Sequence, residues 1–409
     1  MNVLKRFFKY VSIDTTSDPT KDKNPTSKGQ IKLAEMIVGE FKNMRLDDFY
    51  FDEENCYVYA YLKGNPDLPS IGFISHLDTS KDAKGKNIKP IIHEKYDGKD
   101  IQLNETTILS PEKYPSLKNH VGKTLITTDG TTLLGADDKA GIAEIMAMLD
   151  YFTVSHSNRG DIYVCFTPDE EIGMGTDNIN YDIFKPDIAY TVDGSRAGEL
   201  AYENFNAATA NIKITGTPSH CGTAKGVMVN AGRIATIFNN LMPNELPENT
   251  EMYEGFFHLD EISGNVGEAN LKYLIRDFDK DNFEKRKQMI QKITDELNER
   301  YGNCIELNIV DKYRNMLEII EQYPELIERT KTAIEKTGTD VFIKAIRGGT
   351  DGTDISFNGI PCPNLGTGGY NYHSVYEYIC VEDMERVVEI LISIVKKFAK
   401  TNKNTITKK

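Results

Sequence analysis

The 409-residue chain lacks a long apolar run. Its first residues, MNVLKRFFKYVSIDTTS, place Lys5, Arg6 and Lys9 early, so we expect no signal peptide. No stretch approaches the roughly 20 apolar residues that cross a bilayer. Internal repeats and low-complexity tracts are also missing from the sequence. The length indicates two or three domains, and we expect them to be cytoplasmic.

Cysteines are few and show no metal-binding or disulfide-rich spacing. The chain contains six, without a C-x-x-C pair. This usage favours free, mostly buried thiols in a reducing compartment. The six positions are Cys56, Cys165, Cys221, Cys304, Cys362 and Cys380.

Positive charge is in the minority. The chain has 48 Lys and Arg against 62 Asp and Glu, a formal net charge of −14. Such a balance disfavours nucleic acid and anionic membranes as partners. It suits a small cationic ligand only weakly, because most surface charge serves solvation.

The first 206 residues alternate helical and strand patterns. Apolar residues recur at i, i+4 and i+8 in residues 27–41, with Ser27 as the candidate N-cap, and they recur with helical spacing in residues 135–152. Strand-like runs occupy residues 57–62, 70–75, 161–167 and 187–192. The alternation predicts a mixed, largely parallel α/β sheet flanked by helices. Residues 81–125 are polar and turn-rich, which indicates an insertion with a function or with small hairpins of its own.

A different pattern begins near residue 206. Alternating strands and two amphipathic helices, the second at residues 281–302, predict an α+β domain with an antiparallel sheet. After residue 312 the helix and turn pattern of the first region returns. We therefore expect a catalytic domain in two segments, 1–206 and 313–409, with a domain inserted at 207–312.

Acidic and imidazole side chains follow several of the predicted strands. Ligands in open α/β sheets bind beyond the carboxyl ends of the strands, where such groups come together. His76 and Asp78 are two apart on an extended segment, so they point the same way. The other members of this set are Asp137, Asp138, Glu170, Glu171 and Asp193.

This many carboxylates could not ionise together without a compensating positive charge. The imidazole among them favours zinc or a similar metal over magnesium or calcium. The number of groups exceeds one coordination sphere and predicts two metals about 3.5–4 Å apart that share a carboxylate. A second imidazole is expected, and His373 in GTGGYNYHSVYEY is the candidate.

Each of these features also has a structural interpretation. His76 and Asp78 could form a structural hydrogen bond, and Asp137 with Asp138 could cap the following helix. Glu170 and Glu171 could lie in a solvated turn, and Asp193 before a glycine is ordinary turn chemistry. Their coincidence at strand ends favours the metal site. No role is assigned to the remaining residues His93, His120, His156 and His258.

Seven motifs together resemble one enzyme family. They are SHLDT, DGTTLLGADDKAGIAEI, TPDEEIGMGT, TVDG, GTPSHCGTAKG, RGGTDGTDIS and PNLGTGGYNYHS. In this order, through nearly the whole chain, they are similar to the co-catalytic dizinc peptidases that include glutamate carboxypeptidases and aminoacylases. The stretch ILSPEKYPSL resembles the branch that removes the N-terminal residue from tripeptides. The inserted domain resembles the lid and dimerisation domain of the family, which implies a homodimer.

The resemblance implies roles for individual residues. Asp137 would bridge two Zn²⁺ ions, and Asp138 would not be a ligand. His76 and Asp193 would complete one metal site, and Glu171 and His373 the other. Asp78 would orient His76. Glu170 would be the general base that takes a proton from water and returns it to the leaving amine.

Substrate contacts are expected from the inserted domain and the glycine-rich RGGTDG loop. The resemblance implies that His220 reaches a catalytic site, in its own or a second subunit, to stabilise the oxyanion; a loop histidine with a local hydrogen bond is the alternative. A terminal carboxylate is best held by a guanidinium, for which Arg276 and Arg347 are candidates, with Asn265 as a weaker contact. Gly348, Gly349 and Gly352 would allow the backbone to approach the ligand.

Other functions remain open from the sequence. Close alternatives are a related dizinc dipeptidase, carboxypeptidase or N-acyl amino acid deacylase. A metallophosphoesterase would also use paired metals, but its Gly-Asn-His signature is absent. A non-catalytic scaffold with this fold is disfavoured by the complete set of metal-ligand types together with Glu170.

Overall fold

The computed structural model describes residues 2–155, 157–403 and 406. The chain divides into two compact units. Unit 1 contains residues 1–202, 316–344 and 350–409, and unit 2 contains residues 203–315 and 345–349. Within the described residues, no helix is long and apolar enough to cross a membrane.

Unit 1 is built on a mixed sheet with the strand order β1-β2-β8-β3-β9-β16-β10-β15. Its strands are β1 (Asp48–Asp52), β2 (Tyr57–Leu62), β3 (Ile71–His76), β8 (Ile162–Thr167), β9 (Ile188–Gly194), β10 (Glu199–Ala201), β15 (Phe342–Ile343) and β16 (Asn364–Gly366). The central strands β8, β3, β9 and β16 are parallel to one another. The pairs β1–β2, β2–β8 and β10–β16 are antiparallel. The predicted fold class is confirmed.

Helices cover both faces of this sheet. They are α1 (Val3–Val11), α2 (Lys28–Phe41), α3 (Ala136–Val154), α6 (Leu317–Ile320), α7 (Pro324–Glu335), α8 (Asp351–Phe357) and α9 (Val381–Phe398). Ile355 of α8 packs in one buried cluster with Ile74 and Cys165 of the sheet. On the other face, Phe41 of α2 stacks on Phe166, the neighbour of Cys165. Because alternate residues of a strand face opposite sides, α2 and α8 lie on opposite faces.

The long segment after β3 carries short strands of its own, as its turn-rich sequence indicates. It contains β4 (Ile91–His93), β5 (Ile101–Gln102), β6 (Ile108–Leu109), the 3₁₀ helix η1 (Pro115–His120) and β7 (Leu125–Thr127). A small sheet of order β17-β18-β7-β4 joins this segment to the strands β17 (Gly369–Tyr370) and β18 (Tyr378–Cys380).

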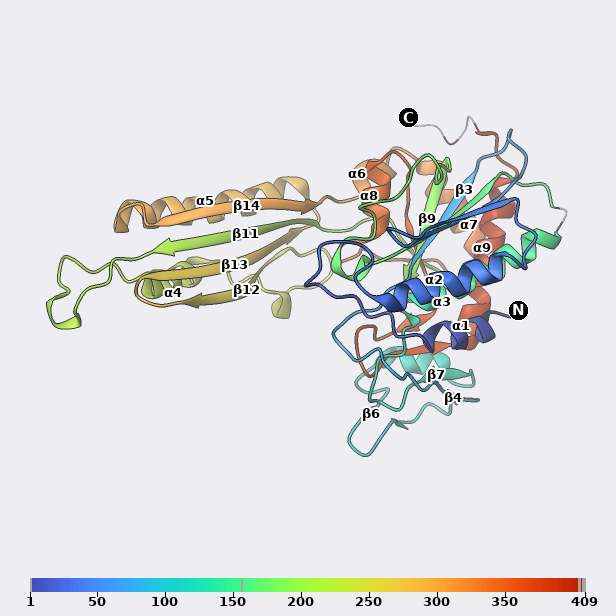
Figure 1. The fold of residues 1–409 in the computed structure, drawn as a ribbon, viewed down its shortest axis with the longest axis horizontal. Coiled ribbons are helices and arrows are strands. Elements are labelled where there is room, and N and C mark those ends of the chain that lie inside the picture. The colour runs from blue at the N-terminus through green and yellow to red at the C-terminus, as the bar shows by residue number, and fades with distance from the viewer. Residues whose placement is uncertain (1, 156, 404–405, 407–409) are drawn as a thin grey trace. The chain divides into compact units, whose positions relative to one another are not determined.

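Unit 2 is an antiparallel sheet with two helices packed on one face (Figure 1). Its elements are β11 (Asn206–Thr215), η3 (Cys221–Thr223), α4 (Ala231–Leu241), η4 (Pro247–Asn249), β12 (Phe256–Gly264), β13 (Glu268–Asp277), α5 (Lys280–Tyr301) and β14 (Ile305–Tyr313). Phe238 of α4 and Ile290 of α5 share a buried cluster with Ile212 and Tyr273 of the strands. The sequence alternation of β11 and β13 therefore reflects one apolar face and one exposed face.

Two local details differ from the expectations. Residues 347–356, which look turn-rich in sequence, include the start of helix α8 at Asp351. Ser27 occupies the N-cap position of α2, but its side chain makes no cap hydrogen bond. The six cysteines are free and five of them are buried, which agrees with the predicted free, mostly buried thiols; Cys221 is exposed.

Candidate metal centre

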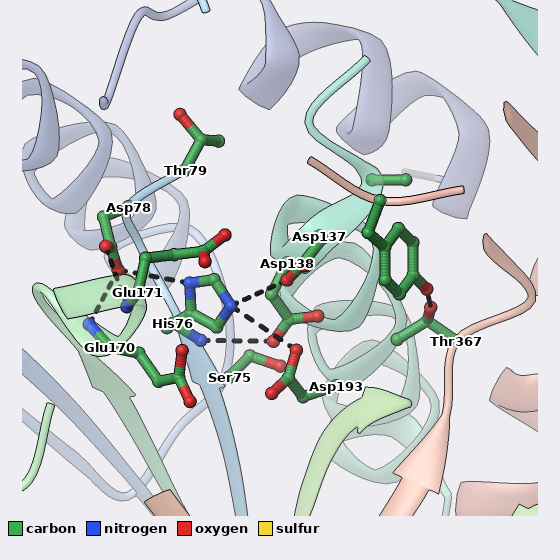
Figure 2. Close-up of polar contacts among 12 residues, drawn as sticks. Ser75, His76, Asp78, Thr79, Asp137, Asp138, Glu170, Glu171, Asp193 and Thr367 are labelled. Atoms are coloured by element: carbon green, nitrogen blue, oxygen red, sulfur yellow. Dashed lines mark hydrogen bonds and ion pairs between the residues drawn. The ribbon is translucent and has the colours of Figure 1, made fainter. Parts of the chain in front are cut away.

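The candidate site lies in unit 1 at the carboxyl ends of the central strands (Figure 2). His76 is the last residue of β3, and Asp193 lies near the end of β9. Glu170 and Glu171 form the 3₁₀ helix η2 (Glu170–Ile172), which follows β8. Asp137 is in the first turn of α3, where its backbone and that of Asp138 depart from helical geometry and the bond between them is cis.

Asp137 lies between two imidazoles. Its Oδ1 is 2.8 Å from Nε2 of His76, and its Oδ2 is 3.1 Å from Nε2 of His373. Each imidazole also faces a second carboxylate: His76 Nε2 is 3.4 Å from Asp193 Oδ1, and His373 Nε2 is 2.9 Å from Glu171 Oε2. The arrangement is two imidazole–carboxylate groups that share one carboxylate, that of Asp137.

Glu170 is close to the group formed around His76. Ligand-type atoms of His76, Glu170 and Asp193 lie within 4.8 Å of one another, as do those of His76, Asp137 and Glu171. Figure 2 shows the carboxylates of Glu170 and Asp193 on the same side of the His76 ring. The structure thus brings together all the metal-ligand candidates in unit 1.

Asp78 connects His76 to the glutamates. Its Oδ1 lies 3.2 Å from Nδ1 of His76 and accepts a hydrogen bond from the backbone N–H of Glu170 at 3.0 Å. Its Oδ2 accepts from the N–H of Glu171 at 3.2 Å. Because Asp78 is fully buried, it fixes the ring orientation of His76 and the position of η2 at once.

The carboxyl groups perturb one another strongly. Burial, with the nearby charge of Asp137, raises the pKa of Glu171 and that of Asp193 to about 7 in each case. Burial, followed by the charge of Asp193, raises the pKa of Glu170 well above its usual value. For Asp137, burial acts in the same direction, but hydrogen bonds from His373 and His76 outweigh it and lower the pKa.

The pKa values of both imidazoles are raised as well. Hydrogen bonds to Asp137 and Glu171 raise the pKa of His373 to about 11. Burial lowers the pKa of His76, but Asp193 and Asp137 outweigh burial and hold it well above the usual value. The carboxylates therefore draw positive charge to the two ring nitrogens, which is where a bound cation would meet them.

The residues fit a pair of metal ions. Imidazole nitrogen and carboxylate oxygen are ligands suited to zinc and similar transition metals. The Oε1 atom of Glu171 is buried and has no hydrogen-bond partner, and such an atom is costly unless a ligand satisfies it. His76 is 2% exposed, whereas His373 is 42% exposed, so its side of the site is open to solvent.

Two supporting contacts carry no signal in the sequence. Asp82, in the polar insertion, has Oδ2 at 3.5 Å from Nδ1 of His373. Asp169, before the glutamates, accepts hydrogen bonds from the backbone N–H of Thr26 at 2.9 Å and from Gln30 Nε2 at 2.6 Å. Both acids look like ordinary surface or turn residues, because their partners are distant in sequence.

The residues predicted to contact substrate lie in unit 2, where the structure describes their local contacts. His220 is exposed, and its Nδ1 accepts from the N–H of Gly222 at 3.2 Å. Arg347 donates to the carbonyl oxygens of Met252 and Glu254 and to Thr250 Oγ1. Their roles toward substrate stay predictions.

Arg276 and Asn265 also make contacts within this unit. Arg276 Nη1 donates to the carbonyl oxygens of Ala208 and Ile275, and its guanidinium lies over the ring of Tyr313. Asn265 accepts from the backbone of Gly267 in the turn between β12 and β13. Their roles toward substrate are likewise predictions.

A largely parallel α/β sheet that ends in buried carboxylates and imidazoles is the arrangement of a metal-dependent hydrolase. The sequence model described as Peptidase family M20/M25/M40 matches residues 130–397, more than half of the chain. The chain belongs to this peptidase family. The predicted family is therefore confirmed, and so is the predicted class of enzyme, a metal-dependent peptidase.

Individual relatives agree with this assignment. The chain is 50% identical to Peptidase T of Alkaliphilus oremlandii over 98% of its own length and 100% of that protein. Its fold is similar to that of aminopeptidase PepT from Bacillus cereus, with a TM-score of 0.78 and 22% identity, covering 97% and 98% of the two chains. A Bacillus subtilis structure described as a dinuclear metal binding peptidase from the M20 family has a TM-score of 0.65 at 11% identity, covering 98% of each chain.

Proposed function

We propose that this chain is an aminopeptidase that removes the N-terminal residue from tripeptides with two Zn²⁺ ions. The observation that carries the proposal is the position of Asp137, with one oxygen toward His76 and the other toward His373. The 50% sequence identity with a Peptidase T over 98% of the chain supports a peptide substrate. The similar fold of a peptidase described as dinuclear metal binding supports the metal count.

In this proposal Asp137 would be shared by the two ions. His76 and Asp193 would hold one ion, and His373 and Glu171 would hold the other. A bound metal pair would lower the pKa of water and polarise the scissile carbonyl. Asp78 keeps the Nδ1 side of His76 occupied, so that Nε2 faces the metal.

Glu170 is proposed as the general base. Its backbone is held by Asp78, and its carboxylate lies near His76 and Asp193 without being needed as a ligand. A base works best when its pKa is near the operating pH, and burial shifts the pKa of Glu170 upward in that direction. Glu170 then takes a proton from the attacking water and delivers it to the leaving amine.

Substrate length requires a group that recognises the far end of the peptide. Arg276 is proposed to bind the terminal carboxylate, because guanidinium matches that group. Arg347 is proposed as a weaker partner, since both of its Nη atoms already donate within unit 2. His220 is proposed as the oxyanion donor and Asn265 as a polar substrate contact.

The proposal also covers assembly and location. A homodimer formed through the inserted domain, residues 207–312, would allow His220 to act in its own or a partner subunit's site. The free thiols and acidic composition favour the cytoplasm.

Elemental analysis combined with peptide hydrolysis tests the function. We expect two zinc ions per chain, hydrolysis of tripeptides in preference to di- and tetrapeptides, and loss of activity after chelation that zinc restores. N-acetylation of the tripeptide should abolish hydrolysis. Equal rates for blocked and free tripeptides would rule out an aminopeptidase and favour a deacylase or carboxypeptidase.

A further inference from the structure

Glu377 binds the segment that carries Asp137. Its Oε2 accepts hydrogen bonds from the backbone N–H groups of Leu134 and Gly135 at 2.6 and 2.9 Å. Its Oε1 accepts from those of Ala136 and Asp137 at 2.7 and 3.2 Å. Four consecutive amides therefore point at one carboxylate, which is 2% exposed.

The backbone of this segment is shaped for an anion. Gly135 has φ +77° and ψ +26°, a left-handed conformation that glycine adopts without penalty. Successive N–H groups around such a residue form a concave anion-binding surface. The first amides of a helix also lack partners inside the helix, and here Glu377 supplies them at the start of α3.

Glu377 also belongs to the segment of the other imidazole. It lies four residues after His373, in the loop between β17 and β18. His373 Nε2 meets Asp137 Oδ2 at 3.1 Å. The two segments are thus joined twice, once through side chains at the metal centre and once through Glu377 and the backbone.

We propose that Glu377 is a positioning residue that sets the Asp137 carboxylate between His76 and His373 and so determines metal affinity. This inference rests on the proposed function, because it takes the carboxylate and imidazole groups as a metal centre. Both carboxyl oxygens of Glu377 accept backbone N–H groups, so it acts through the backbone of the segment that carries Asp137. Supporting groups of this kind typically change metal affinity by about 10–100-fold when altered.

The variant Glu377→Gln tests the proposal. A glutamine has the same shape, but its amide nitrogen would face two N–H donors instead of accepting from them. We expect zinc dissociation constants, measured by competition with a chelator, to rise about 10–100-fold. Excess zinc should recover turnover in part, with a larger change in kcat than in KM. An unchanged zinc affinity in the folded variant overturns the proposal.

Glu40→Gln is the matched control. Glu40 is also a buried carboxylate of unit 1, and it pairs with Arg6 at 2.8 Å and Lys9 at 3.0 Å. Its loss should lower the melting temperature and leave zinc affinity unchanged. Equal losses of zinc affinity in both variants would assign the effect to general stability and overturn the positioning role.

Hydrogen exchange in the wild-type protein supplies a test that needs no variant. The amides of residues 134–137 should exchange slowly, and faster exchange in Glu377→Gln should be confined to them. Exchange in the wild type as fast as in an exposed loop overturns the proposal. Wild-type protein that binds zinc but does not cleave tripeptides would contradict the proposed function and leave the role of Glu377 intact.

Discussion

His76 and His373 lie against different oxygens of one carboxylate, that of Asp137. One ring comes from the end of β3 and the other from a loop near the C-terminus. A carboxylate in this position can hold two cations close together, because each oxygen faces its own imidazole. Two further carboxylates lie at the same rings: Asp193 contacts His76, and Glu171 contacts His373.

If Glu170 is the general base, its substitution should reduce turnover without reducing metal binding. Glu170→Gln should retain the wild-type zinc content, because the ligands assigned above stay intact. Its kcat should fall about 10²–10⁴-fold, the usual contribution of a general base. Zinc analysis and steady-state kinetics on a tripeptide measure both quantities. Glu53→Gln, at an exposed turn, should match the wild type, and a near-normal kcat for Glu170→Gln would refute the assignment.

The carboxylate that contacts His76 is more buried than the one that contacts His373. We therefore expect substitution of the first to reduce kcat/KM more than substitution of the second. Asp78 is fully buried and also binds the backbone of Glu170 and Glu171. Asp82 is 60% exposed and lies 3.5 Å from His373. We expect Asp78→Asn to reduce kcat/KM about 10–100-fold. Asp82→Asn should cost at most about fivefold, since exposed pairs contribute little. Kinetics at saturating zinc compares them, and a larger loss for Asp82→Asn would contradict this ordering.

Zinc binding should strengthen as pH rises. The pKa of His373, raised to about 11, keeps that ring protonated near pH 7 when no cation is bound, and the raised pKa of His76 favours its protonated form as well. A metal binds the neutral ring, so binding must release these protons. Each proton released adds about one unit of log affinity per pH unit. Chelator competition between pH 6 and 8 measures the slope, and a flat profile would show that these rings do not bind the metal.

Much of the site was predictable because acids and an imidazole follow strands of a parallel sheet, whose carboxyl ends meet. The pairing of His76 with Asp78 follows from the two-residue period of an extended chain, and the structure shows it at 3.2 Å. The sharing of Asp137 between two rings could be inferred only from a resemblance, because spacing does not say which of two adjacent acids faces the site.

Other features could not be read from the sequence. Glu377 binds backbone amides, which leave no trace in side-chain patterns, and Asp82 lies in a polar insertion where an aspartate is ordinary. Helix α8, which begins at Asp351, was not predicted because the glycines in and before it have low helix propensity. For Glu377 and Asp82 the missing information was a contact between segments far apart in the chain.

Recognition of the peptide carboxylate gives a prediction for unit 2. Arg276 is held by carbonyl oxygens through Nη1 and stacks over Tyr313, so its orientation is fixed before substrate arrives. Arg276→Lys keeps the charge but loses the planar fork that matches a carboxylate. Hydrogen bonds to charged groups contribute about 1.5–3 kcal/mol, which corresponds to a loss of about 10–100-fold in kcat/KM for tripeptides.

The effect should depend on the free carboxylate. Tripeptide amides, which lack it, should be cleaved equally by Arg276→Lys and the wild type, because neither enzyme can make the contact. Arg233→Lys, at an exposed position of α4, controls for the change in side-chain type and should leave both substrates unaffected. If Arg276→Lys lost the same factor on amides as on free tripeptides, the residue would stabilise unit 2 rather than read the end of the peptide.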